Sequence, residues 1–344
     1  MKILLAGLGS VGQRHARNLR TTLGDGVELL AYRVRGLPHV ITPDLRLEPG
    51  ADVESCYGVR VFTDLDSALA EKPDAVFVTN PNGLHMPVAL AAARAGCHLF
   101  IEKPLSHTLE GVDELAELIE RQRLVCLVGY QLRFHPGLRA MQSCLSARAI
   151  GNVVAARLVF GEYLPGWHPY EDYRQMPSMR PELGGGLILA QIHDLDYAFA
   201  LFGLPRSVFA RGGHFSNLEV PVEDTVSVVM DCDVNGRRIA VQLHQDCLQR
   251  PATRTCEVIG DAGTMMLDFN ASTFRVSRRD RPVESRTFEG HQRNQLFLDE
   301  LQHFLACLRG EAQPIVPLGD AMQSLRMAIA VKTSMETGAV VTLS

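Results

Sequence analysis

The chain has 344 residues, of which 46% are hydrophobic and 21% charged, and its formal net charge at pH 7 is −5. This length predicts two domains, each large enough to bury its own core. The negative net charge and the lack of a long Lys/Arg run argue against a nucleic-acid-binding surface or a polybasic membrane patch. No apolar stretch has the length of a membrane span and no signal-peptide cleavage pattern is present, so we expect a cytoplasmic protein with a small-molecule partner.

The first twelve residues form an apolar run that leads into a G-x-G-x-x-G motif, which comprises Gly7, Leu8, Gly9, Ser10, Val11 and Gly12. The first glycine permits a tight turn, the second lets a pyrophosphate approach the backbone, and the third lets the next helix pack closely on the strand. Residues 13–23 are a plausible helix. A strand, this loop and a helix together predict a dinucleotide-binding site.

Strands and helices then alternate over the first third of the chain, which predicts a doubly wound parallel sheet. Segment 36–58 is rich in Pro, Asp and Gly, and we expect it to be a long irregular loop. The expected strands are 27–32, 74–79, 98–101 and 124–129, and the expected helices include 84–95 and 109–121.

From residue 151 strands dominate, which predicts a second, α+β domain with an open, mainly antiparallel sheet. We assign residues 1–124 to an NAD(P)-binding Rossmann domain and residues 125–344 to substrate binding and oligomerisation. The expected strands are 153–161, 208–212, 225–234, 237–245, 255–259, 264–269 and 272–276. The expected helices are 136–146, 186–201, 294–309 and 320–336.

The clearest element of this domain is a hairpin around Asn235-Gly236, a dipeptide suited to a two-residue turn. Pairing about that turn places apolar residues opposite one another on one face: Cys232 and Ile239, Met230 and Val241, Val228 and Leu243. The other face is more polar and carries Asp233, Asp231, Arg238, Ala240 and Gln242. This register predicts a half-buried antiparallel sheet.

The residue at the end of the second strand indicates which cofactor, NAD or NADP, the protein binds. An acidic residue there usually binds the ribose hydroxyls and selects NAD. This chain has Arg33 at that position and Arg35 close by. Guanidinium groups suit a 2′-phosphate, so we favour NADP, with NAD as the other possibility. The alternative is that both arginines are solvated surface charges.

Two further loops follow strands of the parallel sheet, at the edge where ligands bind. Thr79 and Asn80 begin the first loop and are expected to line the cofactor, together with His85, unless His85 only caps the following helix. Glu102 and Lys103 end the next strand, before a proline. At this edge the Lys103 ammonium is expected to face the nicotinamide.

In the second domain a glycine run at 184–186 precedes Gln191, His193 and Asp196. These three residues do not all share one helix face. Taken alone, a single histidine in such a segment is more often a buried, hydrogen-bonded core residue than a catalytic one, and this interpretation applies to His193. The glycines, however, suggest that backbone closely approaches another domain or a ligand.

Residues 162–180 hold the only tryptophan of the chain in a segment interrupted by prolines. Trp167, Tyr173 and Arg174 offer aromatic faces and a forked donor, which suit a sugar ring with a carboxylate or phosphate. We expect a loop that closes over the cofactor. The alternative is an aromatic loop packed on its own domain or at a subunit contact.

Together these motifs resemble the glucose–fructose oxidoreductase and inositol dehydrogenase (Gfo/Idh/MocA) family. The matching pieces are residues 7–12 with His15, residues 80–82 with His85, Glu102-Lys103-Pro104, residues 129–134, and the glycine run that ends at 193–196. The resemblance implies hydride transfer between a pyridine nucleotide and a sugar, amino sugar, sugar acid or polyol. It implies that Lys103 lies near the reacting carbon, that His193 donates or accepts a proton, and that Gln131 and Arg133 bind substrate.

The sequence departs from the family pattern at one position that affects the predicted catalytic role of His193. Many relatives carry an aspartate about one helical turn before the histidine, whereas this chain has Leu189 and Ala190 there. Gln191 is expected to act in its place as a substrate-binding group, and Lys103 becomes the primary catalytic candidate. Two alternatives remain open, a glycosidase of the same family that oxidises its substrate transiently with bound NAD, and a nucleotide-sensing regulator without catalysis.

The resemblance also bears on assembly. Open sheets of this kind pair face to face in relatives, so a homodimer or homotetramer built through the C-terminal sheet is expected. No Cys or His spacing indicates a metal site.

Overall fold

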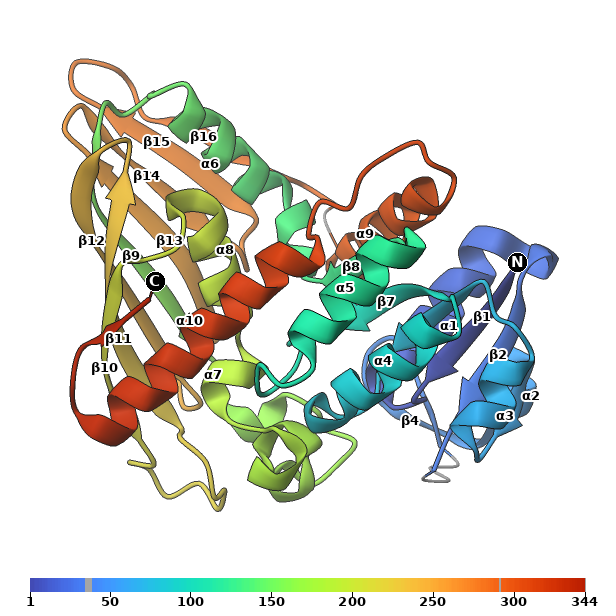
Figure 1. The fold of residues 1–344 in the computed structure, drawn as a ribbon. Helices are drawn as coiled ribbons and strands as arrows, with labels where there is room; N and C mark the ends of the chain where they lie inside the picture. Colours follow the sequence, from blue (N-terminus) through green and yellow to red (C-terminus); the bar gives the residue numbers. More distant parts are fainter. Residues whose placement is uncertain (35–38, 291, 344) are drawn as a thin grey trace.

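Figure 1 shows the computed structural model, which describes residues 1–34, 39–290 and 292–343. Arg35 lies outside the described residues. A parallel sheet built from the N-terminal part and a larger sheet built from the C-terminal part stand at opposite ends of the molecule, with helices between them. Within the described ranges, no helix combines the length and apolar character that crossing a bilayer requires.

The N-terminal sheet has six parallel strands in the order β5-β2-β1-β6-β7-β8, which confirms the doubly wound prediction. It extends to Gly129, past the expected domain boundary at 124. Its strands are β1 (Lys2–Ala6), β2 (Glu28–Tyr32), β5 (Val59–Phe62), β6 (Ala75–Val78), β7 (His98–Glu102) and β8 (Cys126–Gly129). The connecting helices include α1 (Ser10–Leu23), α3 (Leu65–Ala70), α4 (His85–Arg94) and α5 (Val112–Gln122).

The prediction of an irregular loop over 36–58 was wrong for the part that the structure describes. This part forms β3 (His39–Ile41), β4 (Leu47–Asp52) and α2 (Val53–Tyr57). Polar side chains of α1 hold it, because Gln13 Nε2 donates to the His39 carbonyl at 2.9 Å and Gln13 Oε1 accepts from Ile41 N at 2.7 Å. Local composition does not reveal such long-range bonds.

The C-terminal sheet has nine strands in the order β16-β15-β14-β13-β9-β12-β11-β10-β17. All of its pairs are antiparallel except β9 with β12, and the predicted register about Asn235-Gly236 is confirmed. Both turn residues have positive φ, 53° and 77°, as this turn requires. The strands are β9 (Val153–Gly161), β10 (Ser207–Gly213), β11 (Thr225–Val234), β12 (Arg237–Asp246), β13 (Thr253–Gly260), β14 (Gly263–Asp268), β15 (Thr273–Arg278), β16 (Glu284–Thr287) and β17 (Val341–Thr342).

The helix predicted over 186–201 is interrupted in the structure. It is divided into α7 (Leu187–Ala190) and α8 (His193–Phe202). Both carbonyls at the break accept from distant side chains: Ala190 O accepts from Lys103 Nζ at 2.7 Å, and Gln191 O accepts from Gln245 Nε2 at 2.8 Å in addition to Asp194 N at 3.4 Å. The break therefore places His193 at the first turn of α8, beside the N-terminal part of the chain.

Three other helices pack on or between the two sheets. The helices α6 (Pro136–Ser146) and α10 (Leu318–Thr337) pack on the large sheet, and α10 continues along α8 to β8 (Figure 1). The third helix, α9 (Arg293–Leu308), returns to the N-terminal sheet, where the Phe304 ring packs edge-on against Phe77 and Phe100 at 5.5 Å from each. The C-terminal segment thus helps to form the core of the nucleotide-binding part.

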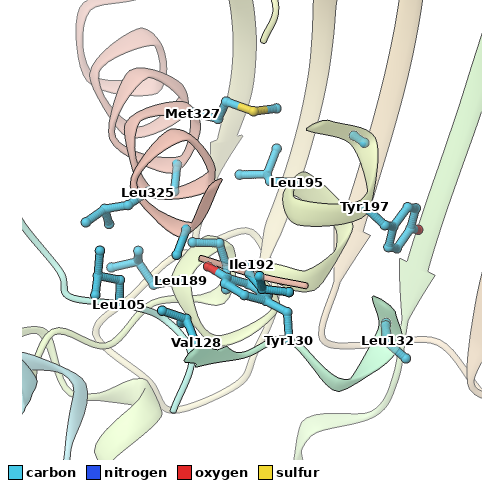
Figure 2. Close-up of a cluster of buried hydrophobic side chains, with 14 of the residues drawn as sticks. Leu105, Val128, Tyr130, Leu132, Leu189, Ile192, Leu195, Tyr197, Leu325 and Met327 are labelled. Carbon is cyan, nitrogen blue, oxygen red and sulfur yellow. The ribbon is translucent and has the colours of Figure 1, made fainter. Parts of the chain in front are cut away.

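A shared apolar core lies where the two parts meet (Figure 2). Leu105 and Tyr130 come from the N-terminal part, and they pack with α7 and α8 residues such as Leu189 and Ile192 and with Leu325 of α10. All five side chains are fully buried. Because interiors are close-packed, this core holds the loop after Lys103 in a defined position relative to the segment before His193.

Candidate active site

The glycine motif has the shape that a dinucleotide requires. A Cβ on Gly12 would lie 2.2 Å from the Gly7 carbonyl oxygen, and one on Gly7, at φ +113°, would lie 2.9 Å from Asn80 N, so both glycines are sterically required. A Cβ on Gly9 would have nothing within 4 Å. The start of α1 has no side-chain cap and no acid in its first turn. Its free N–H groups and the open face at Gly9 fit a pyrophosphate.

His85 connects the two loops that were expected to line the cofactor. Its Nδ1 lies 2.8 Å from the Pro104 carbonyl oxygen and its Nε2 lies 2.8 Å from the Asn80 carbonyl oxygen. The ring is buried and is the first residue of α4, which has no side-chain cap, so His85 is not a helix cap. We conclude that His85 sets the position of the peptide that follows Lys103.

Lys103 extends from the end of β7 to the C-terminal part of the chain, where Nζ donates to the Ala190 carbonyl. Burial lowers the pKa of Lys103 to about 8, and the neighbouring Arg254 and Arg293 act in the same direction, against Glu102 and Asp194. A lysine with this pKa exchanges its proton near neutral pH, as an acid–base group in catalysis requires.

Glu102 and His15 form a buried pair behind Lys103. The distance between Glu102 Oε1 and His15 Nε2 is 2.7 Å, and Glu102 Oε2 accepts from the Lys103 backbone N at 3.2 Å. Although burial opposes ionisation of Glu102, the hydrogen bond and charge of His15 lower its pKa overall. Since His15 lies on α1, the pair connects the helix that follows the glycine motif to Lys103.

His193 lies beside Gln131, with 3.4 Å between His193 Nε2 and Gln131 Nε2. Burial, and then the charges of Lys103, Arg254 and Arg293, lower the pKa of His193 well below its usual value. The imidazole is therefore neutral at neutral pH. Among the described residues, His193 Nδ1 and Gln131 Oε1 have no hydrogen-bond partner although both atoms are buried. Such atoms favour a site that bonds to a ligand.

Gln191 is held by Arg254, a residue that the sequence analysis did not single out. Arg254 Nη2 donates to Gln191 Oε1 at 2.6 Å, and Arg254 Nε lies 3.4 Å from Asp194 Oδ1. A signal was present in the sequence, because Arg254 alternates with Cys256 and Val258 on the inward face of β13. Arg293, at the start of α9, was missed too, and its charge acts on both Lys103 and His193.

The remaining predicted substrate residues bond to other protein groups. Arg133 makes a forked ion pair with buried Asp196, at 2.6 and 2.9 Å. Arg174 pairs with Asp172 and Glu219 on the surface. The structure does not bring either guanidinium into a hydrogen bond or ion pair with Lys103 or His193.

Segment 162–183 folds as a series of short 3-10 turns: Leu164–Gly166, Tyr173–Gln175, Pro177–Met179 and Pro181–Leu183. Tyr173 OH accepts from Glu219 N at 3.4 Å, and Trp167 Nε1 donates to the Glu162 carbonyl at 3.3 Å. Burial raises the pKa of Tyr170, and the side chain of Ser10 in the glycine motif acts against that rise, so Tyr170 lies near this motif. The segment therefore reaches the glycine motif, and its closure over the cofactor stays a prediction.

Arg33 lies directly after β2, at the position expected to contact the cofactor ribose. Its Nη1 is 3.8 Å from Glu54 Oε1 of α2. A cation and a carboxylate thus lie together at this strand end.

These features define a class of protein: a Rossmann domain whose strand-end lysine bonds to a second α/β domain three residues before a buried histidine, as in nicotinamide-dependent oxidoreductases. The chain belongs to the Gfo/Idh/MocA oxidoreductase family. Residues 1–130 match the model described as "Oxidoreductase family, NAD-binding Rossmann fold", and residues 142–343 match "Oxidoreductase family, C-terminal alpha/beta domain".

Individual relatives agree with this assignment. The chain is 31% identical over 282 residues to 1,5-anhydro-D-fructose reductase of Ensifer adhaerens, covering 77% of this chain and 78% of that protein. It is 24% identical over 353 residues to scyllo-inositol 2-dehydrogenase (NAD(+)) of Bacillus subtilis, covering 98% and 95%. A levoglucosan dehydrogenase complex with NADH and levoglucosan has the same fold, with a TM-score of 0.82, 17% identity and 99% coverage of both chains.

Proposed function

We propose that this protein is a dehydrogenase or reductase that acts on a hydroxyl or carbonyl carbon of a sugar, amino sugar, sugar acid or polyol. The observation that carries this proposal is the meeting of Lys103 with the segment that holds Ala190 and His193. The names of the relatives support the substrate class.

In this mechanism the bound nicotinamide supplies or accepts the hydride. Lys103 in its neutral form accepts the proton of a substrate hydroxyl during oxidation, and in its charged form donates that proton to a carbonyl oxygen during reduction. The Ala190 carbonyl holds Nζ in place. Neutral His193, beside Gln131, orients the same oxygen and assists the proton transfer.

A substrate screen tests this proposal. Purified protein is incubated with NADP or NAD and with inositols, aldoses, amino sugars and sugar acids, and the absorbance of the reduced nicotinamide is followed. We expect turnover with at least one member of the panel. Tight binding of cofactor without net turnover would instead favour the glycosidase or the regulator.

We propose that the enzyme prefers NADP, because Arg33 lies where a 2′-phosphate would bind. Arg33→Ala is expected to weaken NADP binding by about tenfold or more, the loss of one charge-assisted bond, with little effect on NAD. Glu54→Gln removes the carboxylate beside Arg33 and is expected to strengthen NADP binding. Fluorescence titrations with both reduced cofactors measure these changes, and equal affinity of the unaltered protein for both would contradict the preference.

We also propose that the protein forms a homodimer or homotetramer through the outer face of the large sheet. Phe209 and Val229 are neighbours on that face and are 38% and 47% exposed, and they line a shallow groove with Val340. Exposed apolar patches of this kind mark interaction surfaces. Val229→Asp is expected to give monomers at micromolar concentration in light-scattering measurements. Val283→Asp, at a valine elsewhere that is 59% exposed, is the control, and a monomeric unaltered protein would contradict the proposal.

A further inference from the structure

Arg14 is a buried arginine of α1 that the proposed reaction does not use. It lies two residues after Gly12 of the glycine motif and is only 8% exposed. Its guanidinium stacks on the Phe297 ring of α9, 4.5 Å from the ring centroid. Within residues 1–34, 39–290 and 292–343, Arg14 makes no hydrogen bond or ion pair. Because an arginine has five N–H donors and buried donors are normally bonded, this side chain favours an acceptor supplied by a ligand.

The other two arginines of α1 bond to the protein. Arg17 Nη1 donates to the Ile41 carbonyl at 2.7 Å and to Tyr57 OH at 2.8 Å. Arg20 donates to three backbone carbonyl groups at 2.8–3.0 Å. These two guanidinium groups hold the helix to its neighbours. The unbonded state of Arg14 is therefore a property of its own position and not of this helix.

The helical spacing directs Arg14 toward the glycine motif. Ser10, the first residue of α1, lies four residues before Arg14, so the two side chains share one face of the helix. Helical side chains lean toward the N-terminus of their helix. The guanidinium of Arg14 therefore extends toward the end of α1 where the free N–H groups and the open face at Gly9 fit a pyrophosphate.

No neighbouring group on the protein supplies an acceptor for Arg14 among the contacts of the described residues. Burial lowers the pKa of Arg14 to about 10, and the charge of Glu102 acts in the opposite direction, so the guanidinium is charged at neutral pH. Both oxygens of Glu102 are bonded elsewhere, to His15 Nε2 and to the Lys103 backbone N. The Phe297 ring attracts a cation but accepts no ordinary hydrogen bond.

We propose that Arg14 binds the pyrophosphate of the nicotinamide cofactor and that Phe297 positions it for this contact. The inference rests on the proposed function, because it assumes a dinucleotide cofactor. The planar fork of a guanidinium matches phosphate oxygens, and its bonds to them are charge-assisted. Arg14 adds a charged side chain to a site that the glycine motif forms from backbone. Since Phe297 lies on α9, the C-terminal part of the chain contributes to cofactor binding.

Ligands with and without a pyrophosphate test this proposal. Calorimetry measures the binding of NADH, NADPH and ADP-ribose, and competition with the reduced cofactor measures the binding of adenosine. We expect Arg14→Gln to weaken the three pyrophosphate ligands by roughly tenfold or more, the loss of one charge-assisted bond. Adenosine should bind with the same affinity as before. Arg14→Lys should retain part of the affinity, because it keeps the charge but not the fork.

Two further variants show whether the effect belongs to Arg14. Arg94→Gln, at a surface arginine that pairs with Glu114, is the control for loss of one positive charge. Phe297→Leu keeps an apolar side chain but removes the ring, and we expect it to weaken ADP-ribose binding by about two- to fivefold. In the Arg14→Gln background the same change should have no further effect, because its partner is gone. Thermal unfolding is measured for every variant.

The outcomes separate this inference from the proposed function. If Arg14→Gln weakens adenosine and ADP-ribose equally, Arg14 serves the folding of α1 and the inference is wrong. Turnover of a sugar by a protein whose Arg14→Gln variant binds ADP-ribose normally would leave the dehydrogenase in place and overturn the inference. Selective loss of pyrophosphate ligands in Arg14→Gln, with no turnover of any sugar by the unaltered protein, would support the role of Arg14 and contradict the dehydrogenase.

Discussion

Lys103→Met is expected to lower kcat by roughly 10²–10³-fold while the affinity for NADPH or NADH changes little. Methionine keeps the apolar stem of the side chain, so the variant removes the ammonium group with little change in packing. The amine donates to the Ala190 carbonyl and, in the proposed mechanism, exchanges a proton with the substrate oxygen. Steady-state kinetics on a substrate found in the screen, together with cofactor titration, measure both quantities.

The pH dependence gives a second readout of Lys103. Because the pKa of Lys103 is lowered to about 8, kcat/KM for oxidation should rise with pH and level off above that value, where the amine is neutral. The rate of reduction should fall over the same range. Lys103→Arg keeps the charge but does not lose its proton in this range, so its oxidation rate should be low and free of this step. Near-normal turnover in Lys103→Met would contradict the mechanism.

His193→Asn is expected to lower kcat by roughly 10²–10⁴-fold, the usual contribution of a positioned proton-transfer group. The variant keeps a polar side chain beside Gln131 but has no imidazole nitrogen to share a proton. The family resemblance implies an aspartate in many relatives where this chain has Leu189 and Ala190. Because His193 has no such partner here, we expect its effect in the lower part of this range.

The structure also changes the expected pH profile for His193. Burial and three cations hold its pKa well below the usual value, so its titration lies below the neutral range. The step near pH 8 should therefore persist in His193→Asn, because it belongs to Lys103. A profile whose step disappears in His193→Asn and persists in Lys103→Arg would reverse the two assignments. Unchanged NADPH or NADH binding is the control for folding.

Much of the fold follows from local patterns in the sequence. Gly7 and Gly12 predicted the tight turn and the close helix packing, and an added Cβ at either position would indeed clash with backbone. The Asn235-Gly236 turn with its apolar alternation predicted the hairpin register residue by residue. These signals are local, because a turn requires particular backbone angles and a strand pair has a period of two.

The parts that the sequence analysis missed depend on contacts between distant segments. The segment around His39 and Ile41 is ordered by Gln13, which lies on another element. The helix before His193 is interrupted because Lys103 and Gln245 occupy its carbonyl groups. No local pattern encodes these bonds, which form only when the two halves of the chain pack together.

The amino-acid sequence by itself determined the Rossmann motif, the strand-end lysine and the hairpin of the second sheet, since each depends on residues close in the chain. Only the tertiary structure decided which charges surround the lysine and the histidine. Arg254 on β13 and Arg293 on α9 are far from Lys103 in sequence, yet their charges act on it in the fold. Electrostatic forces depend on distance in space and on burial, and folding alone sets both.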